Sequence, residues 1–552
     1  MKSSFSSIQR LSILQEMSTI NLDILVIGGG ITGTGIALDA KTRGASTGLI
    51  EMCDFSSGTS SKSTKLVHGG LRYLKQFEIK EVSEIGKERA IVYENAPHVT
   101  TPIRMLLPTV KNGAFNRLTL SAGLTVYDRL AKVKKHERHT ILSKKETLKK
   151  EPLLDEKKVK GGGDYVEYRT DDSRLTLEVL KRAVSYGAYA SNYVKAEDFL
   201  YRNNKVIGVR AVDQQTGKVH NIYAKKIINA AGPWVDTIRE KDQSNHGKRL
   251  HLTKGVHITI NRKRLPLKQA VYFDAPDKRL LFAIPRDDKV YIGTTDIEYN
   301  DSISKARMTN EECEYILNAL NKTFVRQELT INDVESSWAG VRPLIHEEGK
   351  DASEISRKDE IFLSDTGLIS IAGGKLTGYR KMAERVVDLV TKDLKKETNK
   401  TYSKCQTKHI QLSGGDVGGS LNFKKIIKDK IKEGTTIGLT FNEAEELVNR
   451  YGSNVDQLYE VIRTKGEEAK YYNLTKSIFA MVVYSLEQEM TVTPSDFFVR
   501  RTGGLFFHIE WVRKWKDAII NCMAHRLHWT KEIKNTQQKK LEDYIIKVTT
   551  PL

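Results

Sequence analysis

The stretch LDILVIGGGITGTGIALDAKTRGASTGLIE, residues 22–51, decides the fold. Its apolar run Ile24–Ile27 predicts a buried parallel strand. A glycine-rich turn follows, and apolar positions at helical spacing then predict a helix that stops at Gly44. Thr47–Ile50 predicts a second strand, which ends at an acidic residue. This order of strand, turn, helix, strand and acid predicts an α/β fold of the Rossmann type with a dinucleotide site.

Three glycines and one carboxylate of this stretch have defined tasks at such a site. Gly28 allows the tight turn out of the strand, Gly30 lets the backbone approach a pyrophosphate, and Gly33 lets the helix pack closely on the strand. The free N–H groups at the helix N-terminus favour the phosphate charge. Glu51 can accept hydrogen bonds from a ribose diol and disfavours the 2′-phosphate of NADP. By themselves these residues do not separate FAD from NAD.

The next two stretches carry further candidate ligand contacts. Residues 54–65, DFSSGTSSKSTK, are dense in hydroxyl groups and predict a loop. This loop can hold a pyrophosphate or a flavin, and a solvated loop is an equally good interpretation. Residues 66–74, LVHGGLRYL, place His68, Arg72 and Tyr73 beside two glycines, which indicates close approach of the backbone to a ligand. Arg72 can bind a phosphate through two N–H groups.

Two later strand ends are also candidates for cofactor contact. An apolar strand ends in residues 230–233, AAGP, where small side chains let a cofactor or a crossing chain pass close. Leu368–Ala372 predicts another strand, which meets Gly373 and Gly374 and then a helix. The N-terminus of that helix can stabilise negative charge. In a flavoenzyme the natural recipient is the N1–C2=O edge of the reduced isoalloxazine.

A region of alternating polarity predicts an antiparallel sheet distinct from the Rossmann unit. Val256–Ile260 alternates between apolar and polar residues, and this places His257 on the polar face as a candidate acid or base. A structural role is the commoner one for a single histidine. Leu280–Ile284 and Val290–Thr295 predict two strands of a hairpin. Farther on, Pro343 favours an extended backbone that projects the guanidinium of the residue before it. The arginines of this region, either of which can also be a surface charge, are Arg342 and Arg357.

Composition bounds the class of protein. A chain of 552 residues predicts two or three domains, and its longest apolar run, Ile478–Tyr484, is too short to span a bilayer. A net charge of +20 attracts anions or simply confers solubility, and no RNA-binding module is recognisable, so we expect no nucleic acid partner. The cysteines lack a CxxC pattern, which argues against a metal site and favours a reducing cytoplasm; they are Cys53, Cys313, Cys405 and Cys522.

Changes in composition also predict the domain boundaries. Residues 1–20 read as a leader without a secretory signal, either frayed or packed, although their apolar positions can line one helical face and contact a membrane surface. Residues 401–422 are polar and glycine-containing and predict a linker. Residues 423–552 are rich in helix formers and predict a C-terminal α-helical domain.

Together these motifs closely resemble the FAD-dependent glycerol-3-phosphate dehydrogenases. The resemblance runs along essentially the whole chain and is carried by Gly28–Gly33, Gly58–Leu74, Gly340–Leu344, Gly373–Arg380 and Phe498–Thr502. It implies an FAD-binding Rossmann-type domain interleaved, within residues 21–400, with an antiparallel-sheet substrate domain. The substrate domain would lie mainly at about residues 100–165 and 250–340, and the C-terminal α-helical domain would follow.

The resemblance also implies an activity. sn-Glycerol 3-phosphate would be oxidised at C2 to dihydroxyacetone phosphate in glycerol catabolism, with hydride passing to FAD and electrons to a membrane quinone. A cytoplasmic protein held peripherally at the inner, anionic face of the cell membrane would suit that acceptor, and a homodimer is left open. The alternative is a glycerol-3-phosphate oxidase that reduces O2 to H2O2. An amine or amino-acid oxidase would need a carboxylate clamp instead of phosphate-seeking cations.

Specific residues take roles under this resemblance. A base must lie within hydrogen-bond reach of the C2 hydroxyl, and we predict His257 as that base with Arg342 polarising the developing ketone. Expected substrate-binding residues are Arg72, Tyr73, Arg342, Arg357 and Lys375. Expected FAD-binding residues are Gly28, Gly30, Gly33, Glu51, Thr59, Ser60, Ser61, Thr64, His68, Gly232, Gly373, Gly374, Lys375, Leu376 and Thr377.

Overall fold

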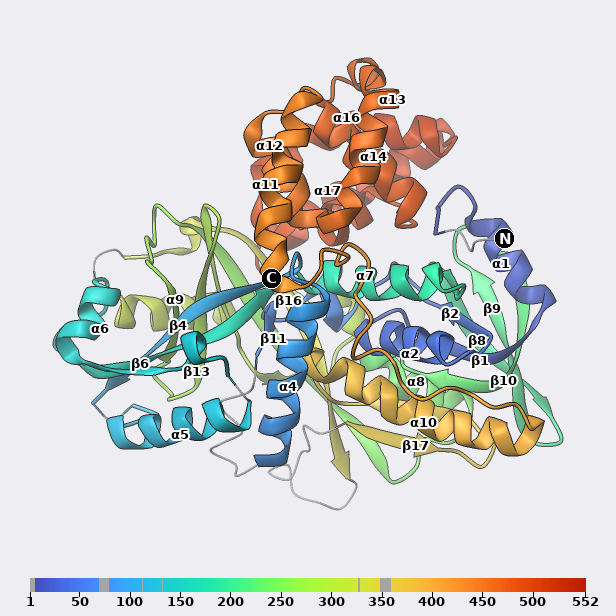
Figure 1. The fold of residues 1–552 in the computed structure, drawn as a ribbon, viewed down its shortest axis with the longest axis horizontal. Coiled ribbons are helices and arrows are strands. Elements are labelled where there is room, and N and C mark those ends of the chain that lie inside the picture. Colours follow the sequence, from blue (N-terminus) through green and yellow to red (C-terminus); the bar gives the residue numbers. More distant parts are fainter. Residues whose placement is uncertain (1–4, 69–78, 112, 132, 326–327, 348–358) are drawn as a thin grey trace.

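The computed structural model describes residues 5–68, 79–111, 113–131, 133–325, 328–347 and 359–552. Within these ranges the chain forms two β-sheets and a cap of helices built from its last residues (Figure 1). The strands of the two sheets alternate in blocks along the sequence, so the sheets are interleaved. The predicted α/β fold class with a C-terminal helical domain is confirmed.

The first sheet contains the parallel strands that the glycine-rich segment predicts. β1 (Asn21–Ile27) pairs in parallel with β2 (Thr47–Ile50) on one side and with β10 (Val219–Asn229) on the other. The remaining strands are β7 (Tyr189–Ser191) and β18 (Ile369–Ala372), which are parallel, and β8 (Val194–Arg202), β9 (Lys205–Asp213) and β17 (Glu360–Leu363), which are antiparallel.

Both faces of this sheet are covered, which explains the continuous apolar run of β1. One face packs against α2 (Ile31–Thr42), α7 (Asp172–Ser185) and α10 (Tyr379–Thr398), and Val26 belongs to that layer. The opposite face packs against the β8–β9 hairpin, and Leu25 belongs to that layer. Because side chains alternate along a strand, burial on both faces leaves no polar position inside β1 apart from Asp23.

The N-terminal segment packs against the second of these faces. α1 (Arg10–Thr19) buries Ile13, Leu14 and Met17, which follow helical spacing from its first residue. Of the apolar positions noted in residues 1–20, Phe5 and Leu14 are buried, as in a packed leader, whereas Ile8 and Leu11 are exposed, so the four do not share one face. Arg10, the first residue of the helix, is also buried, and its guanidinium pairs with Asp213 at 2.6 Å.

The second sheet is mostly antiparallel. β11 (Lys248–Asn261) runs between β14 (Lys289–Gly293) and β16 (Val334–Glu347). Its other strands are β3 (Leu66–Val67), β4 (Thr100–Val110), β5 (Thr140–Ser143), β6 (Val159–Thr170), β12 (Ala270–Asp274), β13 (Leu280–Arg286) and β15 (Ile297–Glu298). Helices of this part of the chain are α4 (Ile79–Asn95), α5 (Arg117–Leu130), α6 (Lys144–Lys150), α8 (Val235–Lys241) and α9 (Asn310–Thr323).

The polar face expected for β11 is not solvated. Both faces of the strand are buried from Thr253 to Ile260, so the polar face that carries His257 is covered by protein. The His257 ring stacks on Trp338 with centroids 4.9 Å apart, and the Thr259 hydroxyl donates to the carbonyl of Phe506 at 2.9 Å. The C-terminal domain therefore covers this face, which alternation within a single strand cannot reveal.

The C-terminal helices form a separate layer over both sheets (Figure 1). Irregular chain leads from the end of α10 to Ser420, where the first of these helices begins. The α-helices are α11 (Ser420–Thr436), α12 (Phe441–Tyr451), α13 (Val455–Lys465), α14 (Lys476–Gln488), α15 (Gly504–Phe507), α16 (Ile509–Arg526) and α17 (Lys531–Thr549), and a π-helical turn, η10, spans Asp496–Arg501. Among the described residues, no helix has the length and apolar content needed to cross a bilayer.

Candidate active site

The glycine turn after β1 is built as tightly as its sequence predicts. Gly28 has φ +116°, and a Cβ there would lie 2.5 Å from the carbonyl oxygen of Ala230. A Cβ on Gly33 would lie 1.9 Å from the carbonyl oxygen of Gly28, so only glycine lets α2 pack this close to the turn. Gly30 differs, because its Cβ would meet only the Ser60 hydroxyl, at 3.2 Å. The turn thus leaves space for a ligand at the N-terminus of α2.

A cavity of about 580 Å³ extends from this turn to the second sheet. Its volume lies in the range of small-molecule sites. Of the expected site residues, those that line it are Gly28, Gly30, Glu51, Thr59, Ser60, Thr64, His68, Gly232, Arg342, Gly373, Gly374, Lys375, Leu376 and Thr377. The described residues that do not line it are Gly33, Ser61 and His257. Arg72, Tyr73 and Arg357 lie outside the described residues.

The nucleotide end of the cavity has the groups that hold a ribose and a pyrophosphate. The Glu51 carboxylate accepts hydrogen bonds from the backbone N–H groups of Gly29 at 2.7 Å and Cys53 at 2.9 Å. Burial raises the pKa of Glu51, and these hydrogen bonds oppose the rise. Ser60 accepts a hydrogen bond from the first N–H of α2, at Ile31, at 3.0 Å. The positive N-terminus of α2 and the open side of Gly30 fit an FAD diphosphate.

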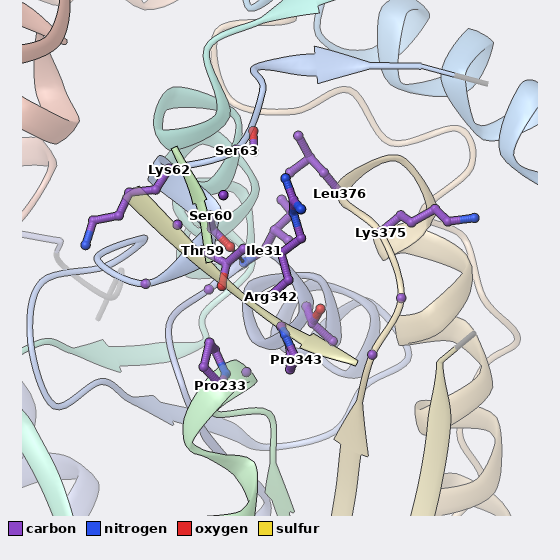
Figure 2. Close-up of a pocket in the computed structure, with 18 of the residues that line it drawn as sticks. Ile31, Thr59, Ser60, Lys62, Ser63, Pro233, Arg342, Pro343, Lys375 and Leu376 are labelled. Carbon is purple, nitrogen blue, oxygen red and sulfur yellow. Dashed lines mark hydrogen bonds between the residues drawn. The ribbon is translucent and has the colours of Figure 1, made fainter. Parts of the chain in front are cut away.

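Arg342 is the candidate substrate-binding cation in the cavity wall. In Figure 2 its side chain lies between the turn that carries Thr59 and Ser60 and the segment that carries Leu376. Its guanidinium donates to the Asp296 carboxylate at 2.9 Å and to the Thr294 hydroxyl at 2.9 Å. All three of these residues line the cavity. The arrangement places a cation, oriented by a carboxylate, where an anionic substrate can reach it.

Lys375 lies on the cavity wall, but its ammonium group is not beside Arg342. Figure 2 shows the side chains of Lys375 and Lys62 leaving on opposite sides of the cavity, each pointing away from the guanidinium. The structure therefore brings Arg342, but not Lys375, to the centre of the site.

Two histidines lie at different depths from the cavity. His68 lines it, and burial together with the nearby charges of Lys375 and Arg89 lowers the pKa of its ring to about 4. His257 lies behind Thr64, with its Nε2 atom 3.1 Å from the Thr64 hydroxyl. Burial and the charge of Arg342 lower the pKa of His257 well below its usual value. Both rings are therefore neutral at pH 7, and only His68 can contact a ligand directly.

Several cavity residues were missed by sequence reasoning. Thr294 and Asp296 follow the end of β14, a strand that was predicted, but a strand pattern does not indicate which end faces a ligand. Residues 194–196 begin β8, the first strand of the β8–β9 hairpin, which is far in sequence from any glycine motif. These residues reach the nucleotide end of the cavity because β8 lies beside β2. The remaining ones include Met52, Tyr165, Glu167, Trp234, Lys241, Tyr272, Arg279 and Phe282.

The fold and this cavity define the class of a flavin-dependent oxidoreductase, and comparison with known proteins agrees. Residues 23–380 match the family described as FAD dependent oxidoreductase, and residues 405–534 match the C-terminal domain of alpha-glycerophosphate oxidase. The chain is 55% identical, over all 552 residues and the whole relative, to the aerobic glycerol-3-phosphate dehydrogenase of Bacillus subtilis. It is 52% identical to that of Staphylococcus haemolyticus, with 99% of this chain and 98% of the relative covered.

Solved structures give the same result. The glycerol-3-phosphate dehydrogenase from Bacillus halodurans complexed with FAD superposes with a TM-score of 0.87 at 50% identity, covering 99% of each chain. The L-alpha-glycerophosphate oxidase of Mycoplasma pneumoniae, at 17% identity and a TM-score of 0.54 over 70% of this chain and 96% of its own, shares the fold. The chain belongs to the FAD-dependent oxidoreductases and, within them, to the family of aerobic glycerol-3-phosphate dehydrogenases. FAD is its cofactor.

Proposed function

We propose that this protein oxidises sn-glycerol 3-phosphate at C2 to dihydroxyacetone phosphate and passes the electrons to a membrane quinone. The observation that carries the proposal is the full-length identity to aerobic glycerol-3-phosphate dehydrogenases, combined with a cation, Arg342, in the wall of the cavity. The phosphate of the substrate distinguishes it from glycerol, and an arginine fork suits a phosphate or a developing ketone oxygen.

The residues of the site divide into three tasks. FAD, when bound, supplies the acceptor for the hydride that leaves C2. Arg342 binds the substrate and polarises the oxygen at C2, with Asp296 and Thr294 fixing the plane of its guanidinium. His68 accepts the proton of the C2 hydroxyl, because it lines the cavity and its ring is neutral. This assignment replaces His257, which contacts Thr64 instead of the cavity.

Phosphate binding in this proposal needs more than one cation. A phosphate dianion is best held by two or three positive groups. Arg72 and Arg357 remain the proposed partners of Arg342 in this task, together with Tyr73, and all three of these lie outside the described residues. Lys375 is proposed to act near the flavin instead, as its position on the wall beside Leu376 and Thr377 favours.

The proposed location follows from the acceptor. A quinone lies in the membrane, and a net charge of +20 attracts the protein to anionic lipid headgroups. We therefore propose peripheral attachment at the inner face of the cell membrane. Sedimentation of membranes in rising salt tests this: release by salt supports an electrostatic attachment, and retention at high salt contradicts it.

The experiment that tests the function is anaerobic. Glycerol 3-phosphate is added to the flavin-replete protein and the oxidised-flavin absorbance is followed, with glycerol as the control. Rapid bleaching with the phosphate ester alone is the expected result, and no bleaching contradicts the proposal. Readmission of air then separates the acceptors: an oxidase makes one H2O2 per turnover, whereas the proposed dehydrogenase reduces an added quinone analogue much faster than O2.

A further inference from the structure

The C-terminal domain contacts the nucleotide site through one buried carboxylate. Residues 51–58 leave β2 and form part of the cavity wall through Glu51, Met52, Ser57 and Gly58. Asp54, in the middle of this loop, does not line the cavity, and its side chain is completely buried. A carboxylate so placed is stable only when cations and N–H donors surround it, and here the cations come from the C-terminal domain.

Two consecutive arginines supply those cations. The Asp54 Oδ2 atom accepts hydrogen bonds from Arg501 Nη1 at 2.7 Å and from Arg500 Nε. Its Oδ1 atom accepts from Arg501 Nη2 at 2.9 Å and from the Asn192 amide at 3.0 Å. Although burial alone would raise the pKa of Asp54, the two guanidinium groups hold it below its usual range. Arg501 thus donates hydrogen bonds to both oxygens of the Asp54 carboxylate.

Both arginines are themselves fixed within the C-terminal domain. They end the π-helical turn η10, whose first residue, Asp496, accepts from Arg500 Nη2 at 2.6 Å. Arg501 also donates to the backbone carbonyl of Glu489 at 2.8 Å, and its side chain is fully buried. The loop of the first domain is therefore held by groups whose positions depend on the folded helical cap.

The same loop is in contact with the glycine turn. A Cβ on Gly29 would lie 2.7 Å from the ring of Phe55, and the Ser56 N–H donates to the Gly29 carbonyl at 2.9 Å. Gly29 in turn donates its N–H to Glu51 at 2.7 Å. Movement of Asp54 would therefore disturb the carboxylate of the ribose site and the turn of the phosphate site together.

We propose that Arg500 and Arg501 are positioning residues for FAD, and that through Asp54 the C-terminal domain sets the affinity of the nucleotide site. A loop that is ordered before binding does not have to be ordered by the ligand, so the affinity is higher. Because coupling between two sites is reciprocal, bound FAD also stabilises the contact between η10 and Asp54. Under this proposal the FVRRT segment, residues 498–502, contributes to FAD binding without contacting the reacting atoms.

The test is the dissociation constant of FAD, measured by equilibrium dialysis of the holoenzyme and read from flavin absorbance. Arg501→Gln is expected to raise it about tenfold or more, because the loop loses its bidentate partner. Arg501→Lys keeps the charge without the fork and should recover part of the loss. Asp54→Asn should also raise the dissociation constant of FAD, but by a smaller factor. It replaces Arg501→Gln as the test if that variant does not fold.

The matched control is Lys181→Met. Lys181 donates to Glu489 at 3.2 Å and to the Tyr484 hydroxyl at 2.7 Å, so its loss weakens the same buried interdomain network without touching Asp54. Its FAD constant should stay within about twofold of wild type despite a lower melting temperature. An unchanged FAD dissociation constant in folded Arg501→Gln, or an equal rise in Lys181→Met, would overturn the proposal.

A second test uses the unaltered protein. Amide hydrogen exchange at residues 496–501 should slow as FAD saturates the protein, and exchange that does not depend on FAD would contradict the proposal.

Discussion

The Nε2 atom of His257 lies 3.1 Å from the hydroxyl oxygen of Thr64, and of these two residues only Thr64 lines the cavity. Trp338 stacks on the imidazole, and a Cβ on Gly293 would lie 2.2 Å from it, so the ring is packed closely between these two residues. His257 therefore supports the wall of the site, whereas His68 forms part of it.

The two histidines should differ sharply when each is replaced by asparagine. His68→Asn is expected to lower the rate of flavin reduction by glycerol 3-phosphate by about 10²–10⁴-fold, the usual contribution of a positioned base. His257→Asn should lower it far less, because the amide can still hydrogen-bond to Thr64. Anaerobic stopped-flow measurement of flavin bleaching provides both rates. A severe loss of the flavin reduction rate in His257→Asn, with a normal rate in His68→Asn, would contradict this prediction. It would indicate that the proton reaches His257 through the Thr64 hydroxyl.

Asp296 is expected to reduce the affinity of the free enzyme for its anionic substrate. Its carboxylate lies 2.9 Å from Arg342 and offsets the charge that the phosphate ester seeks. Asp296→Asn should therefore lower KM several-fold, with an effect that shrinks as salt is added. Steady-state kinetics at low and high ionic strength measure this change.

The control for Asp296 is a second ion pair at the cavity. Arg279 lines the cavity and pairs with Asp277 at 2.6 Å, but both side chains are about two-fifths exposed. Asp277→Asn should leave KM nearly unchanged, since exposed pairs contribute little. A higher KM in Asp296→Asn would mean that the part of Asp296 in orienting the guanidinium outweighs the charge that it offsets.

The sequence could predict the site where the chain itself is continuous. The turn from Gly28 to Gly33 and the strand–glycine–helix junction at Gly373 each place a ligand contact within a few residues, and both line or shape the cavity. The burial of His257 could not be predicted, because the polar face of its strand is covered by Trp338 and the distant C-terminal domain. The role of Arg501 was equally hidden, since its partner Asp54 is 447 residues away. Local patterns do not encode which distant element will cover a face.

Alanine at Gly28 should lower the stability of the fold, whereas alanine at Gly30 should lower the affinity for FAD. Gly28 combines φ +116° with a Cβ position 2.5 Å from Ala230, so Gly28→Ala should destabilise the fold itself by about 1–2 kcal/mol from the backbone alone, and more from the clash. Gly30 has φ −79°, and its Cβ would meet only the Ser60 hydroxyl beside the cavity. Gly30→Ala should therefore keep its melting temperature without FAD and lose FAD affinity. Thermal melts of the flavin-free proteins and FAD titration distinguish the two, and matching melting temperatures would contradict this division.

The protein should lose stability below neutral pH because of His98. This ring is buried, both of its nitrogens lack a hydrogen-bond partner among the described residues, and burial with the charges of Lys181 and Arg174 lowers its pKa to about 3. The folded protein keeps it neutral, while the unfolded chain takes up a proton below its usual pKa of 6.5. Its stabilising contribution is thus complete above pH 6.5 and falls as the pH drops toward 3, by about 2 kcal/mol at pH 5.

Leucine at position 98 removes the titratable imidazole and replaces it with an apolar side chain of similar size. Between pH 7 and pH 5, His98→Leu should lose about 2 kcal/mol less unfolding free energy than the unaltered protein, as measured by denaturant titration at each pH. His136→Gln, at a ring whose side chain is three-quarters exposed, is the control and should follow the unaltered protein. An equal pH dependence in His98→Leu would mean that the buried ring is charged or that it gains a partner in solution. Either result would remove His98 as the cause of the loss of stability below neutral pH.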